Sequence, residues 1–403
     1  MRYDTPDPAL HGSVARSIRL AFGGDKDEDA LNWMDRLGHE YLRVVVSTDG
    51  HLEATAALVP MAQCFGGRAV PMEGVVGVTV PPESRGRGSA TALMTEMVRE
   101  MHERRVPIST LYPATQPLYR RVGFEQAGAR FEWTISVREM VVDGPDAPGV
   151  ELRPAVEGDE EAIEACAERV ALSNPGGLVR GPYCWSRVHW DRMHERRHDA
   201  VVILMDGEVR GFLYYRLTRP DAMERGREMI LRIAACAAED GPAAAALLRF
   251  IAQHRSVATS CTLYQGAGPG MLAMLREQPY RAQLVNHWML RVTHAEEAIS
   301  ARGFAPGVSA EVVIDLADDT IPEQSGAWAL RVSGGAGELT RCDAGVSSRA
   351  GVRMTERDLA ALYSGYMSAA ELSRLGRVEG DAASLASLDA CFASAMPWLS
   401  DAF

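Results

Sequence analysis

Two arginines alternate with two glycines at one turn of the sequence, Arg85-Gly86-Arg87-Gly88. A β-branched run at residues 75–80 comes before this turn, and residues 89–105 follow it with the apolar spacing of a helix. Backbone N–H groups at a helix N-terminus point at one spot, and glycine lets an anion approach without a Cβ in the way. The arginines add charge-assisted hydrogen bonds. The pattern predicts a pyrophosphate-binding turn, for which a tight basic turn without a ligand is the structural alternative.

A second informative segment, ATQPLYRRVGF, occupies residues 114–124. It follows a predicted strand at residues 108–111, and its pattern predicts a short helix that ends at Gly123 before another strand. Tyr119 lies on this helix. Its side chain is either a core aromatic of an amphipathic helix or a proton donor, because a phenol has a reference pKa of about 10.

The elements around these motifs predict a mixed sheet with helices packed on it. Residues 43–47 and 52–59 have the composition of two strands, and they flank Asp49-Gly50, a turn typical of a hairpin. Along the first segment the order is hairpin, strand, helix, strand, helix and strand. This part of the chain is therefore predicted to be the domain that carries the turn.

The middle of the chain repeats this order loosely. Residues 201–205 and 209–217 flank a second turn, Asp206-Gly207, and residues 243–253 have the spacing of a helix. No RGxG turn comes before that helix. We therefore predict a duplicated fold whose second copy has lost its site.

Candidate domain boundaries are marked by segments that contain turn-forming residues. Residues 142–149 contain two glycines, two prolines and two aspartates, which is typical of an interdomain linker. A weaker boundary falls near residue 291, and a strand pair at residues 311–316 and 328–332 follows it. We predict domains at residues 1–145, 146–290 and 291–403.

The composition narrows the classes of function. The chain has 403 residues, of which 42 are basic and 54 acidic, and the formal net charge of -12 disfavours binding to nucleic-acid backbones. Lys26 is the sole lysine and lies outside any Walker motif, which disfavours a P-loop nucleotidase and a Schiff-base enzyme. The 7 dispersed cysteines form no CxxC pair. Without an apolar leader or a membrane-length apolar stretch, the sequence predicts a cytoplasmic protein.

The strand, the RGRG turn and the LYRRVGF segment together resemble the GNAT N-acetyltransferase superfamily, whose acetyl-CoA motif is R/Q-x-x-G-x-G/A between a strand and a helix. More narrowly, the LYRRVGF segment and the apolar C-terminal end resemble the enhanced intracellular survival (Eis) family of bacterial acetyltransferases. The resemblance covers the whole chain. It implies an α+β (mixed α/β) fold, with two tandem GNAT-like mixed-sheet domains and a C-terminal sterol-carrier-protein-like α+β domain. It also implies an acetyl-CoA-dependent N-acetyltransferase that assembles as a homohexamer and needs no metal.

The resemblance assigns site residues position by position. The general acid is Tyr119, and the general base is the free α-carboxylate of Phe403, supplied by the C-terminal domain. A set of strand, turn and helix residues is expected to contact acetyl-CoA. These residues are Val78, Thr79, Val80, Arg85, Gly86, Arg87, Gly88, Ser89, Ala90, Thr91, Ala114 and Thr115. A multi-amine acceptor such as an aminoglycoside is expected in an acidic, aromatic pocket near Phe22, Asp25 and Trp33, for which a solvated loop is the alternative.

Elementary chemistry agrees with the two catalytic roles. Transfer of an acetyl group from a thioester to an amine needs a base for the ammonium and a proton for the leaving thiolate, whose pKa is about 8.5 by analogy with cysteine. A phenol can supply that proton. An α-carboxyl is a poor base in water, but burial beside its own ring and Trp398 would raise its pKa. The ending MPWLSDAF is too apolar for the frayed tail that is the usual alternative.

One competing motif points to a metal enzyme. His194-Glu195-Arg196-Arg197-His198 is a literal HExxH, in which two histidines hold zinc and the glutamate acts as a base. The two arginines instead favour an exposed helix face, and a predicted strand follows at once where a third ligand would be needed. We therefore expect no metal. A non-catalytic carrier of CoA or lipid, with the third domain as its functional module, is the remaining alternative.

Overall fold

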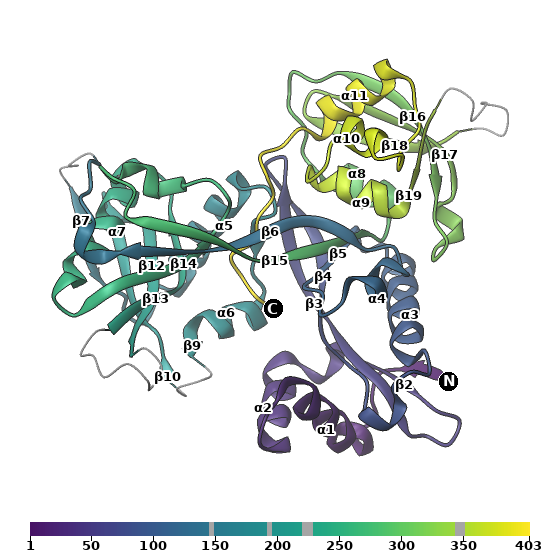
Figure 1. The fold of residues 1–403 in the computed structure, drawn as a ribbon, viewed down its shortest axis with the longest axis horizontal. Helices are drawn as coiled ribbons and strands as arrows, with labels where there is room; N and C mark the ends of the chain where they lie inside the picture. Colours follow the sequence, from purple (N-terminus) through teal and green to yellow (C-terminus); the bar gives the residue numbers. More distant parts are fainter. Residues whose placement is uncertain (145–148, 192–195, 220–228, 343–350) are drawn as a thin grey trace. The chain divides into compact units, whose positions relative to one another are not determined.

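The computed structural model describes the chain except for residues 145–148, 192–195, 220–228 and 343–350 (Figure 1). Its contacts divide the chain into two compact units. Unit 1 contains Met1–Ala127, His287–Ala395 and Phe403, and unit 2 contains Gly128–Asn286 and Met396–Ala402. The domain boundaries predicted after residues 145 and 290 stay a prediction.

The first part of unit 1 is a mixed sheet with helices on it. In sheet order its strands are β1 (Arg2–Asp4), β2 (Leu42–Val46), β3 (Leu52–Phe65), β4 (Arg68–Thr79), β5 (Ile108–Leu111) and the end of β15 (Tyr280–Val292). Only the β4–β5 pair is parallel among these. The predicted hairpin is confirmed as β2 and β3, and β3 and β4 form the long hairpin that Figure 1 draws in purple and blue.

Four helices accompany this sheet. They are α1 (His11–Phe22), α2 (Asp27–Leu37), α3 (Ser89–Glu103) and α4 (Gln116–Arg120). The helix predicted at residues 89–105 is confirmed as α3, and the one in the LYRRVGF segment as α4. The apolar positions of α3 are Leu93, Met94, Met97, Val98 and Met101, and all five are fully buried in the core. Their spacing is that of one helix face, which explains why the sequence predicted this element well.

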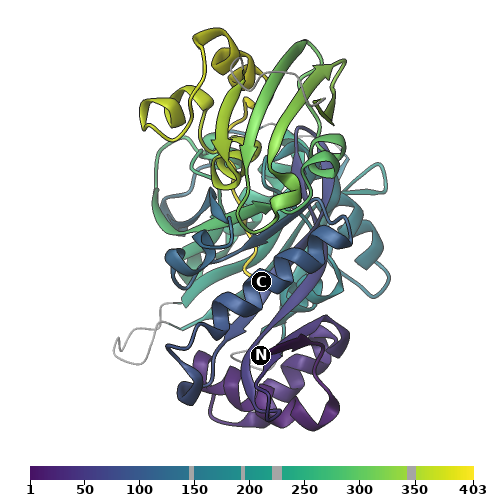
Figure 2. The same ribbon diagram turned by 90° about the vertical axis from the view of Figure 1, so that its right-hand side faces the viewer.

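The rest of unit 1 is a smaller sheet with helices. Its strand order is β18 (Ala336–Arg341), β17 (Gly326–Ser333), β16 (Ala310–Ala317) and β19 (Val352–Thr355). The helices are α8 (Ala295–Ala301), α9 (Glu356–Ser364), α10 (Ala369–Arg374) and α11 (Ala382–Phe392). The predicted strand pair is confirmed as β16 and β17. Figure 2 shows the yellow helices gathered on one side of the green strands.

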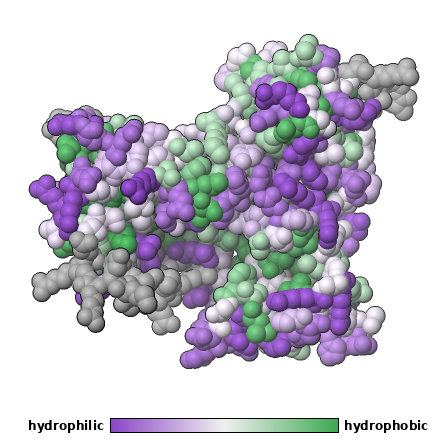
Figure 3. All heavy atoms as spheres, viewed as in Figure 1, coloured by the Kyte–Doolittle hydropathy of each residue, from purple (hydrophilic) through white to green (hydrophobic). Residues whose placement is uncertain are grey.

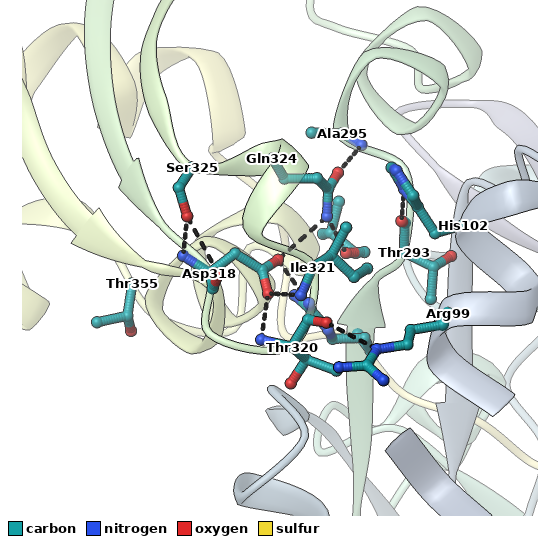
Figure 4. A network of polar contacts seen from close by, with 12 residues as sticks. Arg99, His102, Thr293, Ala295, Asp318, Thr320, Ile321, Gln324, Ser325 and Thr355 are labelled. Carbon is teal, nitrogen blue, oxygen red and sulfur yellow. Dashed lines mark hydrogen bonds and ion pairs between the residues drawn. The ribbon is translucent and has the colours of Figure 1, made fainter. Parts of the chain in front are cut away.

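Asp318 is the centre of a buried polar network in this region (Figure 4). One carboxylate oxygen accepts the backbone N–H groups of Thr320 and Ile321, and the other accepts Gln324 Nε2 and, at 2.5 Å, Arg291 Nη2. Arg291 and Asp318 are almost fully buried. The helix α3 joins the network because Arg99 Nε donates to the carbonyl oxygen of Thr320. The network therefore ties the small sheet to the first part of unit 1.

Unit 2 has its own mixed sheet. Its strand order is β6 (Glu125–Ser136), β14 (Ala258–Gln265), β13 (Met229–Ala238), β12 (Glu208–Thr218), β11 (Asp199–Met205) and β7 (Val150–Pro154). The helices are α5 (Glu160–Ser173), α6 (Pro182–His189) and α7 (Gly241–Gln253). The predicted hairpin is confirmed as β11 and β12, and the predicted helix as α7. At α7 the carboxylate of Asp240 already accepts the N–H group of Ala243, so an acidic side chain stands where α3 has a glycine.

The HExxH stretch does not form the predicted helix face where it is described. His194 and Glu195 lie outside the described residues, whereas Arg196–Arg197 forms the short strand β10, paired with β9 (Trp190–Asp191). His198 Nδ1 lies 2.7 Å from the carbonyl oxygen of Val188. Within the described ranges, no group of three or more histidine, cysteine or acidic side chains is placed to hold a metal ion. In the same ranges no helix is long and apolar enough to cross a membrane.

Candidate active site

The α3 N-terminus offers unpaired backbone donors. Gly88 is the N-cap residue with φ 82°, and Gly86 has φ 78°, a conformation that side chains other than glycine rarely adopt. No acceptor in the described part of the chain takes the N–H groups of Ser89, Ala90 or Thr91, and the first turn has no acidic side chain. A Cβ added at either glycine would meet only open space. The turn can therefore receive an anion at close range.

A buried carboxylate supports this turn. Glu53 on β3 is 7% exposed and accepts a hydrogen bond of 3.1 Å from Ser89 Oγ. Arg87 Nη1 lies 3.9 Å from the second oxygen of Glu53, while most of the arginine side chain stays exposed. Arg85 is exposed as well. The two arginines thus flank the open donors, and Glu53 fixes the start of the helix.

The strands β4 and β5 separate beside this turn. Their parallel pairing covers only Met72, Glu73 and Gly74, opposite residues 108–110. A β-bulge in β4 then shifts its register against β3, and Gly77 in the bulge has φ 66°. Beyond Gly74, β4 pairs with β3 alone within the described residues, so one backbone edge at Val78 is open. Such an edge can pair with an extended amide-bearing ligand.

The other residues predicted to contact acetyl-CoA line the same region. Val78 and Val80 are half-buried against the core, whereas Thr79 is buried and its hydroxyl shares a hydrogen bond of 2.8 Å with Ser17 on α1. Ala114 and Thr115 are exposed just before α4, where Thr115 is the N-cap residue. Val78 thus lies on β4 beyond its pairing with β5, and Ala114 and Thr115 lie between β5 and α4.

Tyr119 is a core residue of this region. It is 4% exposed and packs in the cluster that includes Val75 of β4 and Leu111 of β5. Its ring meets Phe124 edge-on at 6.3 Å between centroids. Burial raises the pKa of the Tyr119 phenol to about 12. Tyr119 is thus packed as a core aromatic, and its phenol is fully protonated at neutral pH.

Phe403 is packed rather than frayed. A Cβ built on Gly74 would lie 2.9 Å from Phe403 Cε2, so the ring lies directly against β4. The ring of Tyr112, the residue after β5, is 5.8 Å away between centroids. Gly74 precedes Val75, and successive residues of a strand face opposite sides of the sheet. Phe403 therefore lies on the face of β4 opposite to the cluster that contains Tyr119.

The segment before Phe403 is anchored within unit 2. Arg180 donates two hydrogen bonds, of 2.6 and 3.0 Å, to the Asp401 carboxylate, and both side chains are about nine-tenths buried. Arg130 Nε donates to the Ser400 carbonyl at 3.0 Å. Trp398 packs against Gly266 of its own unit. These contacts fix the segment at several points.

The three residues predicted for the acceptor lie at the end of α1, in the loop that follows and on α2. Trp33 on α2 is half-buried, and its ring would lie 2.9 Å from a Cβ at Gly77, so it contacts the bulge of β4. Phe22 is 66% exposed at the end of α1, and Asp25 is exposed in the loop that follows. The exposed first turn of α2 adds three more acidic residues. Figure 3 shows hydrophilic and hydrophobic spheres intermixed over these two helices.

Sequence reasoning missed Gly74, Tyr112 and Glu53. All three act through contacts between segments that are far apart in the chain. Glu53 left one signal, because it is an acidic residue inside an otherwise apolar strand, LEATAALV. Gly74 left another, since a glycine between Glu73 and a valine pair weakens a strand unless something approaches it closely.

Comparisons with known proteins agree with this geometry. Residues 7–127 and residues 176–292 match two models of an acetyltransferase (GNAT) domain, and residues 295–400 match a sterol carrier protein domain. The N-acetyltransferase Eis of Mycobacterium tuberculosis is 27% identical over 404 residues, which cover 91% of this chain and 93% of that protein. A GCN5-related N-acetyltransferase from Anabaena variabilis matches over 100% of both chains with a TM-score of 0.91 and 28% identity. Eis1 from Mycobacterium abscessus, 20% identical over 100% of both chains, has the same fold with a TM-score of 0.79.

The fold and these matches define an acetyltransferase of the GNAT superfamily, with two GNAT domains and a C-terminal sterol-carrier domain. The GNAT domains imply acetyl-CoA as the cosubstrate. Within that superfamily the chain is Eis-like. The predicted fold class and the predicted class of enzyme are thereby confirmed.

The contact of Phe403 with Gly74 can be tested by filling the space above the glycine. Gly74→Ala places a methyl group 2.7 Å from Met61 Cε and 2.9 Å from Phe403 Cε2, and we expect the free energy of unfolding to fall by about 1–3 kcal/mol, the usual effect of overpacking. Gly307→Ala is the matched control, since a Cβ there meets only open space. Equal free energies of unfolding for the two variants in chemical denaturation would contradict the contact.

Proposed function

We propose that the protein transfers an acetyl group from acetyl-CoA directly to an amine of a multi-amine small molecule, with aminoglycosides as the model acceptors. The observation that carries this proposal is the position of Tyr119 and Phe403 on opposite faces of β4, where β4 and β5 separate. A thioester held in that gap has a phenol on one side and the ring of the last residue on the other. Tyr119 is proposed as the general acid, and the Phe403 α-carboxylate as the general base.

The residues at the start of α3 fit the pyrophosphate of acetyl-CoA. The free N–H groups of residues 89–91 and the exposed Arg85 and Arg87 supply the donors, and Gly86 and Gly88 leave the approach open. The edge at residues 78–80 supplies backbone partners for the pantetheine arm, and Ala114 and Thr115 a further contact pair. Acetyl-CoA supplies the acetyl thioester and the thiolate leaving group.

The two proposed catalytic groups balance the protons of the reaction. The Phe403 carboxylate accepts a proton from the ammonium, and the freed amine nitrogen bonds to the acetyl carbon. As the carbon–sulfur bond breaks, the nitrogen releases a second proton, which replaces the proton that the phenol gives to the sulfur. Tyr119 donates to the leaving sulfur. Because its pKa of about 12 lies above that of a thiol, the phenol begins by hydrogen-bonding to the developing thiolate and does not ionise beforehand.

The finer features of the proposal derive from the resemblance to Eis. Aminoglycosides as acceptors, a homohexamer and a cytoplasmic location stay predictions. Trp33 against β4 and the acidic turn of α2 support a site for a cationic amine, because acidic groups concentrate cations and an aromatic face attracts them. Phe22, at the end of α1, and Asp25, in the loop between α1 and α2, are proposed to belong to the same site.

The proposed activity predicts release of thiol from acetyl-CoA only when an amine is present. A panel of tobramycin, a polyamine and a lysine peptide, analysed by mass spectrometry after incubation, reports which acceptor gains acetyl groups and how many. We expect the multi-amine compounds to be acetylated. Lipid that co-purifies with the protein, without any thiol release, would favour the non-catalytic carrier.

Replacing Tyr119 with phenylalanine should lower kcat about 100-fold, in the range that a general acid contributes, and leave the KM for acetyl-CoA nearly unchanged. Tyr280→Phe, a half-buried tyrosine of unit 2, is the control. The folded phenol has a pKa of about 12, so the protonated form is lost only as the pH approaches that value. The wild-type kcat should therefore show no fall due to Tyr119 between about pH 8 and about pH 10. A wild-type kcat in Tyr119→Phe would contradict the assignment as general acid, and a fall in this pH range that the variant removes would contradict the raised pKa.

Adding one glycine after Phe403 moves the free carboxylate by one residue, about 3.8 Å between Cα atoms. We expect kcat to collapse in this variant while acetyl-CoA binding, measured by calorimetry, stays the same. One glycine added before Met1 is the control for the extension itself. A wild-type rate in the C-terminally extended protein would remove the terminal carboxylate from the mechanism.

A further inference from the structure

The short helix α4 is tied to the C-terminal part of unit 1 by one buried carboxylate. Glu125, the first residue of β6, has only 2% of its side chain exposed. It accepts hydrogen bonds of 2.6 and 3.0 Å from Arg120 of α4. It also accepts from Arg377 Nη2 at 3.2 Å and from Arg357 Nε at 3.4 Å. Both arginines belong to residues 295–395 of unit 1, here called the sterol-carrier part. One carboxylate thus joins the helix of Tyr119 to two separate segments of that part.

The cluster continues to a second buried carboxylate. Arg377 Nε donates to Asp358 at 2.7 Å, so its guanidinium bridges Glu125 and Asp358. Asp358 is fixed in turn, because it accepts the N–H group and the hydroxyl of Thr355 in the capping box of α9. The anchor of α4 is therefore the N-terminus of another helix and not a mobile surface side chain.

A steric contact reinforces this anchor. A Cβ built on Gly123, at the end of the α4 turn, would lie 2.6 Å from Glu356 Cγ and 2.7 Å from Arg291 Nε. Arg291 is held by the buried Asp318. The turn after Tyr119 therefore lies directly against Glu356 of the sterol-carrier part and Arg291 of β15, and glycine is the residue that allows this approach.

Helix α4 has little means of holding its own orientation. It has five residues, and its N-cap residue Thr115 makes no capping hydrogen bond with its side chain. Isolated helices of this length are unstable in water, so tertiary contacts must set the direction of Tyr119. Arg120, the next residue, provides the charged contact, and Phe124 provides the ring contact.

We propose that Glu125 is a positioning residue for Tyr119, and that the sterol-carrier part thereby controls the orientation of the general acid. The inference rests on the proposed function. It assigns the Arg120–Glu125–Arg377–Asp358 cluster a role in turnover, because an acid displaced from the leaving sulfur contributes less to the reaction. The sterol-carrier part then has a second task besides supplying the final residue.

The first test removes the charge of Glu125 while keeping its shape. Glu125→Gln should lower kcat about tenfold and change the KM for acetyl-CoA by less than about twofold, since the α3 turn is untouched. Arg377→Lys keeps the charge but loses the two-pronged bridge, and it should give the same pattern. Arg353→Gln is the matched control, because Arg353 is an exposed arginine that pairs with Asp315 and Glu379 in the same part of the chain. Wild-type kcat in both Glu125→Gln and Arg377→Lys would overturn the proposal.

The second test separates positioning from general loss of structure. In a Tyr119→Phe background, Glu125→Gln should have little further effect on kcat, because the acid that it positions is already gone. A similar loss in both backgrounds would overturn the proposal and make the cluster merely structural. If Glu125→Gln does not fold, Arg377→Lys in the same two backgrounds gives the same decision. Amine-dependent thiol release by the wild-type protein is measured first, so its absence overturns the proposed function as well, whereas activity without this coupling overturns the positioning role alone.

Discussion

The separation of β4 from β5 after Gly74 is the constraint on which the site depends. A parallel pair that ends inside the sheet leaves backbone donors and acceptors of β4 without strand partners, and buried backbone groups need partners from elsewhere. The bulge at Gly77 shifts the register of β4 against β3 and bends the strand beside its free edge. An extended ligand with amide groups can complete this edge, while the start of α3 receives its anionic end. In the proposed complex, the reacting part of such a ligand lies in this gap, with Tyr119 on one side and Phe403 on the other.

Exposed basic and exposed acidic side chains lie on different elements of this part of unit 1. The chain carries a formal net charge of -12, yet Arg85 and Arg87 stand exposed at the α3 turn. The first turn of α2 is acidic and exposed, and Trp33 of the same helix reaches β4. In the proposed function, the arginines attract an anionic cosubstrate and the acidic turn attracts a cationic acceptor.

Local signals predicted most elements near the site. The RGRG turn, the α3 face and the Asp-Gly hairpins each depend on residues close in sequence, and the structure agrees with all of them. The missed contacts join distant segments: Phe403 to Gly74 and Tyr112, and Glu125 to Arg377. A single sequence has no period or spacing that reports such pairs. The helix predicted for the HExxH stretch was wrong at Arg196–Arg197 for a related reason, because pairing of these residues with β9 overrides the local helical pattern.

The cluster around Glu125 is easier to understand as a device for geometry than as a source of stability. Burying a carboxylate among three arginines costs solvation that the ion pairs only partly recover, and apolar residues of similar size often stabilise a protein better. Directional, multiply bonded groups have another property, since they define one arrangement of the elements that they join. The five-residue helix α4, which carries Tyr119, depends on such contacts for its orientation. The buried ion pairs of Glu125 therefore lie where, in the proposed mechanism, they define the orientation of Tyr119.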